Sequence, residues 1–197
     1  MSETISTSTT PATVSQTGKK PIRWTMIGLW LAIIGLLAVL AWGLINTNAV
    51  RPEAGQNAPD FEMSFFNGYE WEGLSKAGLS DMQGRPVVLN FWASWCVECR
   101  YEAELLEQTW RKYRDDGVIF LGVAYVDTEP KSLEYMKEFA VTYPHAPDLG
   151  TRISRQYEIT GVPETFFIDK NGVIRHVQIG PMSPQLMDTL IPQLLEN

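Results

Sequence analysis

The most informative stretch of the chain reads Pro86-Val-Val-Leu-Asn-Phe-Trp-Ala-Ser-Trp-Cys-Val-Glu-Cys99. Its first part, residues 86–93, is largely apolar, which is typical of a strand buried on both faces of a sheet. From Cys96 to about Arg114 the apolar residues instead recur at helical spacing. The stretch therefore predicts a buried strand that leads directly into a long helix, with two cysteines at the junction.

Two cysteines three positions apart at the start of a helix can close a small disulfide ring. Unpaired N–H groups and the helix dipole favour a thiolate on the first of them, Cys96. We expect Cys96, at the more exposed end, to attack a substrate disulfide and Cys99, one turn inside, to resolve the mixed disulfide. The alternatives are half of a zinc site or two unrelated core cysteines. Zinc needs four ligands, and only His145 and His176 remain as other soft ligands, so we predict a redox pair with no metal and no separate cofactor.

The flanking sequence predicts an α/β sheet of mixed direction with helices on both faces. Upstream, residues 61–66 and 69–71 are expected to form a hairpin about Asn67-Gly68. Downstream, the expected elements are a strand over 118–126, helices over 130–141 and 151–157, a hairpin of strands 165–169 and 173–179, and a last helix from Pro184 to about Leu195. Pro192 is expected to kink or fray the end of that helix.

Residues 24–50 carry no charge, and the apolar run Trp24 to Ile45 is long enough to cross the roughly 30 Å hydrocarbon layer of a membrane. A buried core helix and a cleavable signal peptide are the alternatives, but no small-residue cleavage site follows the run. Three basic residues precede it, which places the N-terminus in the cytoplasm. We therefore predict a disordered cytoplasmic tail over 1–23, a single transmembrane anchor over 24–46, a linker over 47–57 and an extracytoplasmic domain over 58–197.

Composition narrows the possible partners. Of the 197 residues, those from 51 onward include 13 basic and 22 acidic ones, a net charge of −9. Such a domain repels phosphate backbones, so we expect no nucleic-acid partner. With 45% hydrophobic residues the chain can form a packed core, which excludes global disorder.

Three segments carry a resemblance to a known family: Ala58-Pro-Asp-Phe61, Phe91-Trp-Ala-Ser-Trp-Cys-x-x-Cys99 and Gly161-Val-Pro-Glu-Thr-Phe-Phe-Ile-Asp169. Over roughly residues 56–197 the chain resembles the membrane-anchored thioredoxin-like TlpA/ResA/DsbE (CcmG) group. The resemblance implies a thioredoxin-like fold, here preceded by the predicted hairpin extension and one transmembrane helix. It also implies extracytoplasmic thiol-disulfide exchange, often reduction of the haem-binding cysteines of apocytochrome c, with electrons supplied by a membrane thiol donor.

The resemblance further implies roles for individual residues. The Val162-Pro163 peptide bond would be cis beside the cysteines, and Trp95 would join these two residues in contacting the substrate; an ordinary loop proline is the alternative. Glu102 matches a functional glutamate of the family. It lies roughly 60° from Cys99 around the helix, so it borders the buried stripe. Burial would raise its pKa and let it exchange protons with that cysteine. A surface glutamate is the other possibility.

Glu98 departs from the family pattern, which commonly has proline before the second cysteine. Its carboxylate would disfavour a neighbouring thiolate and raise the pKa of Cys96. Because reduction produces the thiolate, this would favour the disulfide and make the reduced protein a better electron donor. The effect is small if Glu98 points to solvent.

Three functions compete. The first is a disulfide reductase or carrier for extracytoplasmic proteins such as apocytochrome c, or a more general reductant or oxidant. The second is a thiol peroxidase, which needs Pro-x-x-x-Thr-x-x-Cys, whereas Leu89 and Ala93 hold the proline and threonine positions. The third is a non-catalytic module that binds peptides at Pro163, and the presence of both cysteines argues against it.

Overall fold

The structure is a computed structural model that describes residues 24–46 and 51–196. The chain divides into two compact units, Met1–Asn48 and Ala49–Asn197. In the first unit, helix α1 (Trp24–Asn46) includes an 18-residue stretch of mean hydropathy 2.3 that is not buried against protein. Its length and composition suit a membrane anchor and also a signal sequence. The predicted tail over 1–23 lies outside the described residues.

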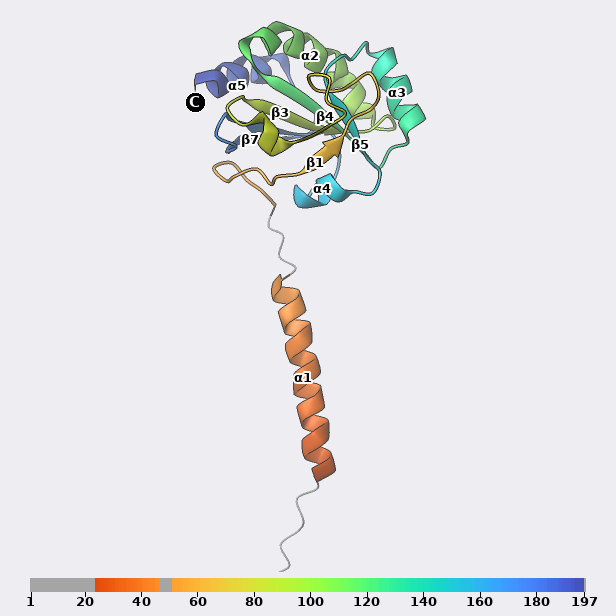
Figure 1. The fold of residues 1–197 in the computed structure, drawn as a ribbon, viewed down its shortest axis with the longest axis vertical. Helices are drawn as coiled ribbons and strands as arrows, with labels where there is room; N and C mark the ends of the chain where they lie inside the picture. The colour runs from red at the N-terminus through yellow and green to blue at the C-terminus, as the bar shows by residue number, and fades with distance from the viewer. Residues whose placement is uncertain (1–23, 47–50, 197) are drawn as a thin grey trace, which may run out of the picture. The chain divides into compact units, whose positions relative to one another are not determined.

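The second unit is built on a five-stranded sheet with the spatial order β5-β4-β3-β6-β7 (Figure 1). The strands are β3 (Val87–Trp92), β4 (Ile119–Tyr125), β5 (His145–Asp148), β6 (Glu164–Ile168) and β7 (Ile174–Ile179). β3 runs parallel to β4 and antiparallel to β6, which pairs antiparallel with β7. The sheet is therefore mixed, as predicted, and its central strand β3 is buried along its whole length.

Helices cover both faces of this sheet, as predicted. Figure 1 shows α2 (Val97–Tyr113), α3 (Glu129–Glu138) and α5 (Pro184–Glu196) on one side, and α4 (Arg152–Gln156) with β1 on the other. The short pieces are β1 (Glu62–Ser64), β2 (Lys76–Gly78), and the 3-10 helices η1 (Leu79–Met82) and η2 (Arg114–Asp116). A hydrophobic core lies on each face of the sheet, and alternate residues of β3 point into one or the other. Val88 and Trp92 pack in the core under α2, whereas Leu89 and Phe91 pack in the core on the opposite face.

The N-terminal hairpin differs from the prediction. β1 pairs antiparallel with β2, and residues 69–71 do not form its second strand. The chain does turn at Asn67-Gly68, but the Phe66 N–H then donates to the His145 carbonyl and the His145 N–H donates to the Tyr69 carbonyl. The backbone groups on either side of this turn therefore form hydrogen bonds with His145 at the start of β5. The strand that pairs with β1 follows later in the chain, so the hairpin loop is longer than the Asn67-Gly68 turn indicates.

One strand was not predicted, and the last helix ends within one residue of its predicted end. β5 was not predicted, because this four-residue strand contains Pro147, follows Pro144 and lacks an apolar run. Helix α5 continues through Pro192 to Glu196, because Ile191 and Leu194 are buried in the core and hold the last turns in place. Its predicted start is correct, since the Ser183 hydroxyl accepts the Leu186 N–H at 3.3 Å.

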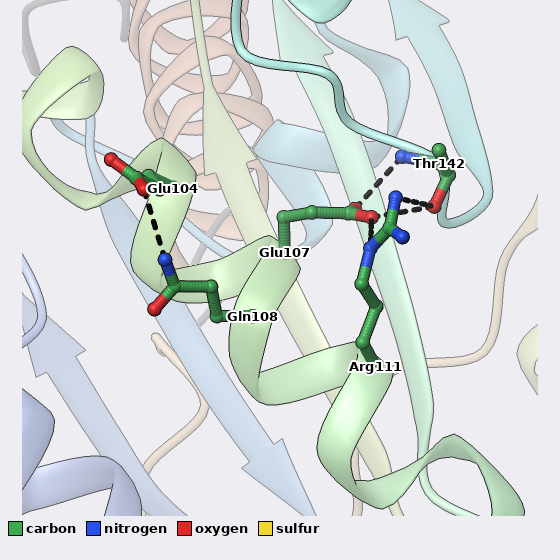
Figure 2. Close-up of polar contacts among 5 residues, drawn as sticks. All are labelled: Glu104, Glu107, Gln108, Arg111 and Thr142. Carbon is green, nitrogen blue, oxygen red and sulfur yellow. Dashed lines mark hydrogen bonds and ion pairs between the residues drawn. The ribbon is translucent and has the colours of Figure 1, made fainter.

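A buried carboxylate fixes α2 to the loop that follows α3. Glu107 is 5% exposed and accepts hydrogen bonds from the Thr142 N–H (2.8 Å), the Thr142 hydroxyl (2.6 Å) and Arg111 Nε (2.5 Å) (Figure 2). Glu104, one turn earlier, bonds the exposed Gln108 instead (Figure 2). The helix that carries the cysteines is thus held to the loop before β5 by polar contacts, in addition to the packing of its apolar face on the sheet.

Candidate active site

The two cysteines form a disulfide at the N-terminal end of α2, with their Cα atoms 5.3 Å apart. Cys96 is the N-cap residue of the helix, and its Sγ accepts the Cys99 N–H at 3.0 Å. A helix N-terminus and a directed N–H both stabilise negative charge, so this sulfur is well placed to leave or attack as a thiolate when the pair is reduced. In the disulfide form Cys96 is 3% and Cys99 1% exposed, so the expected contrast in exposure is small.

The loop before β6 lies against the first cysteine. The Val162-Pro163 peptide bond is cis, and the Val162 carbonyl oxygen is 3.4 Å from Cys96 Sγ. Trp95 is 58% exposed and donates its indole N–H to the Val126 carbonyl at 3.2 Å. The structure thus brings Val162 to Cys96 and leaves the neighbouring Trp95 open to solvent.

Glu98 and Glu102 have opposite environments on α2. Glu98, in the first turn, is exposed. Its charge is screened by water, which is the case in which its influence on Cys96 is small. Glu102 is 1% exposed, so it is not a surface glutamate.

Two donors hold the Glu102 carboxyl. Asn90 Nδ2 donates to Oε1 at 2.9 Å, and the Met182 N–H donates to Oε2 at 2.7 Å. Burial outweighs these two bonds and raises the pKa of Glu102 to about 7. A carboxyl group with this proton affinity, one turn along α2 from Cys99, can accept or release a proton near neutral pH. The Tyr135 hydroxyl, which donates to the Cys99 carbonyl at 2.8 Å, anchors the same turn of the helix.

Comparisons with known proteins agree with this geometry. Residues 54–177 match the AhpC/TSA family. Over 162 residues the chain is 33% identical to the thiol:disulfide interchange protein DsbE of Pseudomonas fluorescens biotype C, which covers 80% of this chain and 85% of that protein. The chain belongs to the AhpC/TSA family, among its ResA/DsbE-like thiol-disulfide oxidoreductases.

Other relatives support the same assignment. The chain is 32% identical over 172 residues to the thioredoxin-like protein YneN of Bacillus subtilis (83% of this chain, 96% of that protein). It is 28% identical to the thiol-disulfide oxidoreductase ResA of Bacillus cereus (73% and 80%). A crystal structure of a thioredoxin-family thiol:disulfide interchange protein from Chlorobium tepidum matches with a TM-score of 0.63 at 27% identity, over 74% of this chain and 98% of that one. The predicted thioredoxin-like fold and enzyme class are confirmed.

The structure of this oxidoreductase also shows a buried carboxyl next to Pro163 that the sequence analysis did not single out. Glu164 directly follows Pro163 and is 1% exposed. It forms an ion pair with Arg51, whereas its Oε2 has no hydrogen-bond partner in the part of the chain that the structure describes. Burial raises the pKa of Glu164 to about 7, although Arg51 opposes this shift. Its place at the start of an apolar run after the family's proline was the available signal.

Residues of the β4–α3 connection were also missed. Asp127 is 5% exposed, and its carboxylate accepts the Ser94 N–H at 2.7 Å and the Ser94 hydroxyl at 3.0 Å. Val126, just before it, has a left-handed φ of 46° and receives the Trp95 indole N–H. This connection therefore holds the two residues that precede Cys96. No local sequence pattern pointed to Asp127, because its partner is 33 positions away.

His145 is buried in the core and has a structural environment. It is 1% exposed, and burial lowers its pKa to about 3, so its ring is neutral. Its Nδ1 accepts the Trp92 indole N–H at 3.0 Å. A Cβ added at Gly122 would lie 1.9 Å from the imidazole, so glycine at that position makes room for the ring.

Proposed function

We propose that this protein is a membrane-anchored, extracytoplasmic reductase of protein disulfides and that apocytochrome c is among its clients. One observation carries the catalytic part of the proposal: a disulfide at a helix N-terminus has the carbonyl of a cis-proline loop at its first sulfur and a buried carboxyl one turn from its second. The client assignment is supported by the family resemblance alone.

The reaction begins with the reduced cysteine pair. The Cys96 thiolate attacks one sulfur of the client disulfide, the other client sulfur leaves as a thiolate, and a mixed disulfide forms. Glu102 then takes the proton of the Cys99 thiol, and the resulting thiolate attacks Cys96 Sγ. The client's second sulfur leaves, and the Cys96-Cys99 disulfide remains. Two electrons have moved from the cysteine pair to the client.

Client binding is assigned to the surface around Cys96. Val162 and Pro163 form one side of it, and the Val162 carbonyl at Cys96 Sγ offers an acceptor to an extended client backbone. Trp95 and Tyr101, which are 58% and 77% exposed, supply apolar area on the helix side. Large aromatic side chains left open to solvent are typical of interaction surfaces.

The location follows from α1 and the charges that precede it. Three basic residues lie before the helix, so the N-terminus is assigned to the cytoplasm and the cysteines to the outside. A thiol donor in the membrane would return the disulfide to the reduced state. A reporter enzyme fused after residue 60 should be active only if it functions outside the cytoplasm; a cytoplasmic signal would reverse this orientation.

The client is identified by trapping. A Cys99→Ser chain expressed in its membrane should accumulate mixed disulfides on Cys96, because the group that resolves them is gone. Gels without reductant followed by mass spectrometry should show apocytochrome c among the adducts, and added thiol should release them.

The matched control for this trap carries Ser at both positions 96 and 99 and should trap nothing. A mixture of unrelated secreted proteins without any haem-binding protein would favour a general reductant or oxidant instead. An absence of adducts from folded Cys99→Ser protein would contradict the exchange mechanism itself.

A further inference from the structure

Asn90 connects the buried carboxyl of Glu102 to strand β6. It lies on the α2 side of β3 and is 2% exposed. Its Nδ2 group donates both to Glu102 Oε1 and to Thr165 Oγ1, each at 2.9 Å. Its Oδ1 is buried without a hydrogen-bond partner among the described residues. A buried amide oxygen with no donor is costly, so the arrangement leaves half of this side chain unsatisfied.

This arrangement favours the ionised form of Glu102. The Met182 N–H and Asn90 Nδ2 each donate to one carboxylate oxygen. A second lone pair on either oxygen could take a proton, but the resulting O–H would need an acceptor, and both of these partners are donors. The Met182 donor is a backbone group and is fixed by its chain. The Asn90 amide can exchange its two ends by turning about its last side-chain bond, because nitrogen and oxygen are nearly equal in size.

We propose that the Asn90 amide turns over when Glu102 takes up a proton, which makes Asn90 the positioning residue that sets the proton affinity of Glu102. In the ionised state Nδ2 donates to Glu102 and Thr165. In the turned state Oδ1 accepts the Glu102 O–H, and it also accepts the Thr165 hydroxyl, which can serve as acceptor or donor. One end of the amide lacks a partner in either state, which keeps the two states close in free energy. The inference rests on the proton-transfer role of Glu102 in the proposed function.

None of the other groups named around Glu102 changes its charge near pH 7 in the oxidised protein, so none of them replaces the turning of the Asn90 amide. On α2, Cys99 is one turn away and is part of the disulfide in the oxidised protein. On α3 and the following loop, Tyr135 and Tyr143 interact electrostatically with Glu102, and burial raises the pKa of both phenols, so they stay neutral around pH 7. The partners from β3, β6 and the loop before α5 are the neutral groups already named.

The test compares Asn90→Leu with the wild-type chain. This variant removes both polar ends and keeps a similar size. The carboxylate then loses a charge-assisted donor, whereas the protonated acid loses a neutral bond of about half the strength. Glu102 should therefore bind its proton more tightly, by about tenfold, or one pKa unit upward.

The measurement is infrared spectroscopy of the full-length oxidised protein in detergent as a function of pH. The Glu102 band is the carboxylic C=O band that disappears in Glu102→Gln, and the Asn90 band is the amide C=O band that disappears in Asn90→Leu. Both bands of the wild-type protein should change with one common midpoint. In Asn90→Leu the Glu102 midpoint should move upward.

Thr109→Val is the matched control, because it deletes another side-chain hydrogen bond of α2, the partly buried one from the Thr109 hydroxyl to the Leu105 carbonyl at 2.7 Å. Its Glu102 midpoint should equal that of the wild type. An unmoved midpoint in Asn90→Leu, or an Asn90 band that does not follow the titration, would overturn the inference. The titration needs no client protein, so its result is independent of the trapping experiment. Either experiment can fail while the other succeeds, which distinguishes a failure of this inference from a failure of the proposed function.

Discussion

Glu102 and Glu164 are buried carboxyl groups on opposite faces of the sheet, and their partners differ in charge. Glu102 and Glu164 are each 1% exposed, and burial raises the pKa of each to about 7. Glu102 is held by two neutral donors, Asn90 Nδ2 and the Met182 N–H. Glu164 is held by the cation Arg51. Cross-strand pairing places Glu164 on the face of Phe91, whereas Glu102 packs on the face of Asn90, so they occupy opposite sides of the sheet.

The difference separates two roles. With neutral partners, proton uptake by Glu102 removes a buried charge and needs only a rearrangement of hydrogen bonds, which suits a group that exchanges protons with a cysteine. With a cationic partner, proton uptake by Glu164 would leave the guanidinium without its counter-ion. Glu164 is therefore better suited to tie the chain at Arg51 to the strand that follows Pro163.

The two carboxyl groups should differ most in their effect on the rate of thiol-disulfide exchange. Glu102→Gln should slow the resolution of the mixed disulfide by two to four orders of magnitude, the usual contribution of a general base. In the wild type this rate should rise with pH through about 7, as Glu102 ionises, and the rise should be missing in the variant. Stopped-flow tryptophan fluorescence with a cysteine-containing peptide disulfide measures both properties.

Glu164→Gln is the comparison for this experiment, since it removes an equally buried carboxyl on the other face. It should keep the rise near pH 7. If Glu164→Gln lost that rise and Glu102→Gln kept it, the two assigned roles would have to be exchanged.

The raised pKa of Glu102 should also make the free energy of unfolding depend on pH. The pKa of Glu102 is about 7 in the folded protein and about 4.5 when unfolded, so the wild type has its full stability below pH 4.5 and loses part of it as pH rises to 7. Each pKa unit corresponds to about 1.4 kcal/mol, so the loss is about 3 kcal/mol. Gln does not titrate. The free energy of unfolding of Glu102→Gln minus that of the wild type should therefore increase by this amount across the window.

Urea unfolding at pH 4.5, 6 and 8, followed by near-ultraviolet circular dichroism of the full-length protein in detergent, gives this difference. A difference that is independent of pH would mean that Glu102 titrates as an ordinary surface carboxyl. That result would remove the basis for comparing it with Glu164.

Much of the fold was predictable because its signals are local. The apolar run of β3, the helical spacing of α2 and the Asn171-Gly172 turn between β6 and β7 each depend on neighbours in sequence. The partner of β1 was not predictable from the Asn67-Gly68 turn, because the backbone groups after that turn bind His145, far along the chain. A turn signal shows where the chain reverses but not which strand it pairs with.

The site divides in the same way. The cysteine spacing and the helical position of Glu102 are properties of one segment, and they pointed to a disulfide at the start of α2 and to a glutamate that borders the buried stripe. The burial of Cys96 was not predicted, because it depends on the loop before β6 that packs against it. Glu164 lies in the third motif, but its role was not predictable from that segment, because its burial depends on the sheet register and its partner Arg51 is 113 positions away.

The smallest expected effect concerns Arg51, and it tests whether Glu164 depends on a cation. Removing the cation in Arg51→Gln raises the pKa of Glu164 further, since burial then acts unopposed. At pH 8 the variant must keep an unpaired buried carboxylate or fold with a proton on it, so its free energy of unfolding should fall by about 1 kcal/mol or somewhat more. At pH 5 Glu164 is protonated in the folded state of both proteins, and the loss should shrink.

The matched control is Lys131→Gln, which breaks the exposed ion pair of Lys131 with Glu134 on α3. Its stability should change little and equally at both pH values, because water screens exposed pairs. Urea unfolding of the three proteins at pH 5 and pH 8 makes the comparison. An Arg51→Gln loss of equal size at both pH values would show that Arg51 acts by packing, since only an electrostatic role makes the loss follow the ionisation of Glu164. In that case the contrast between neutral and cationic partners would not explain the two carboxyls.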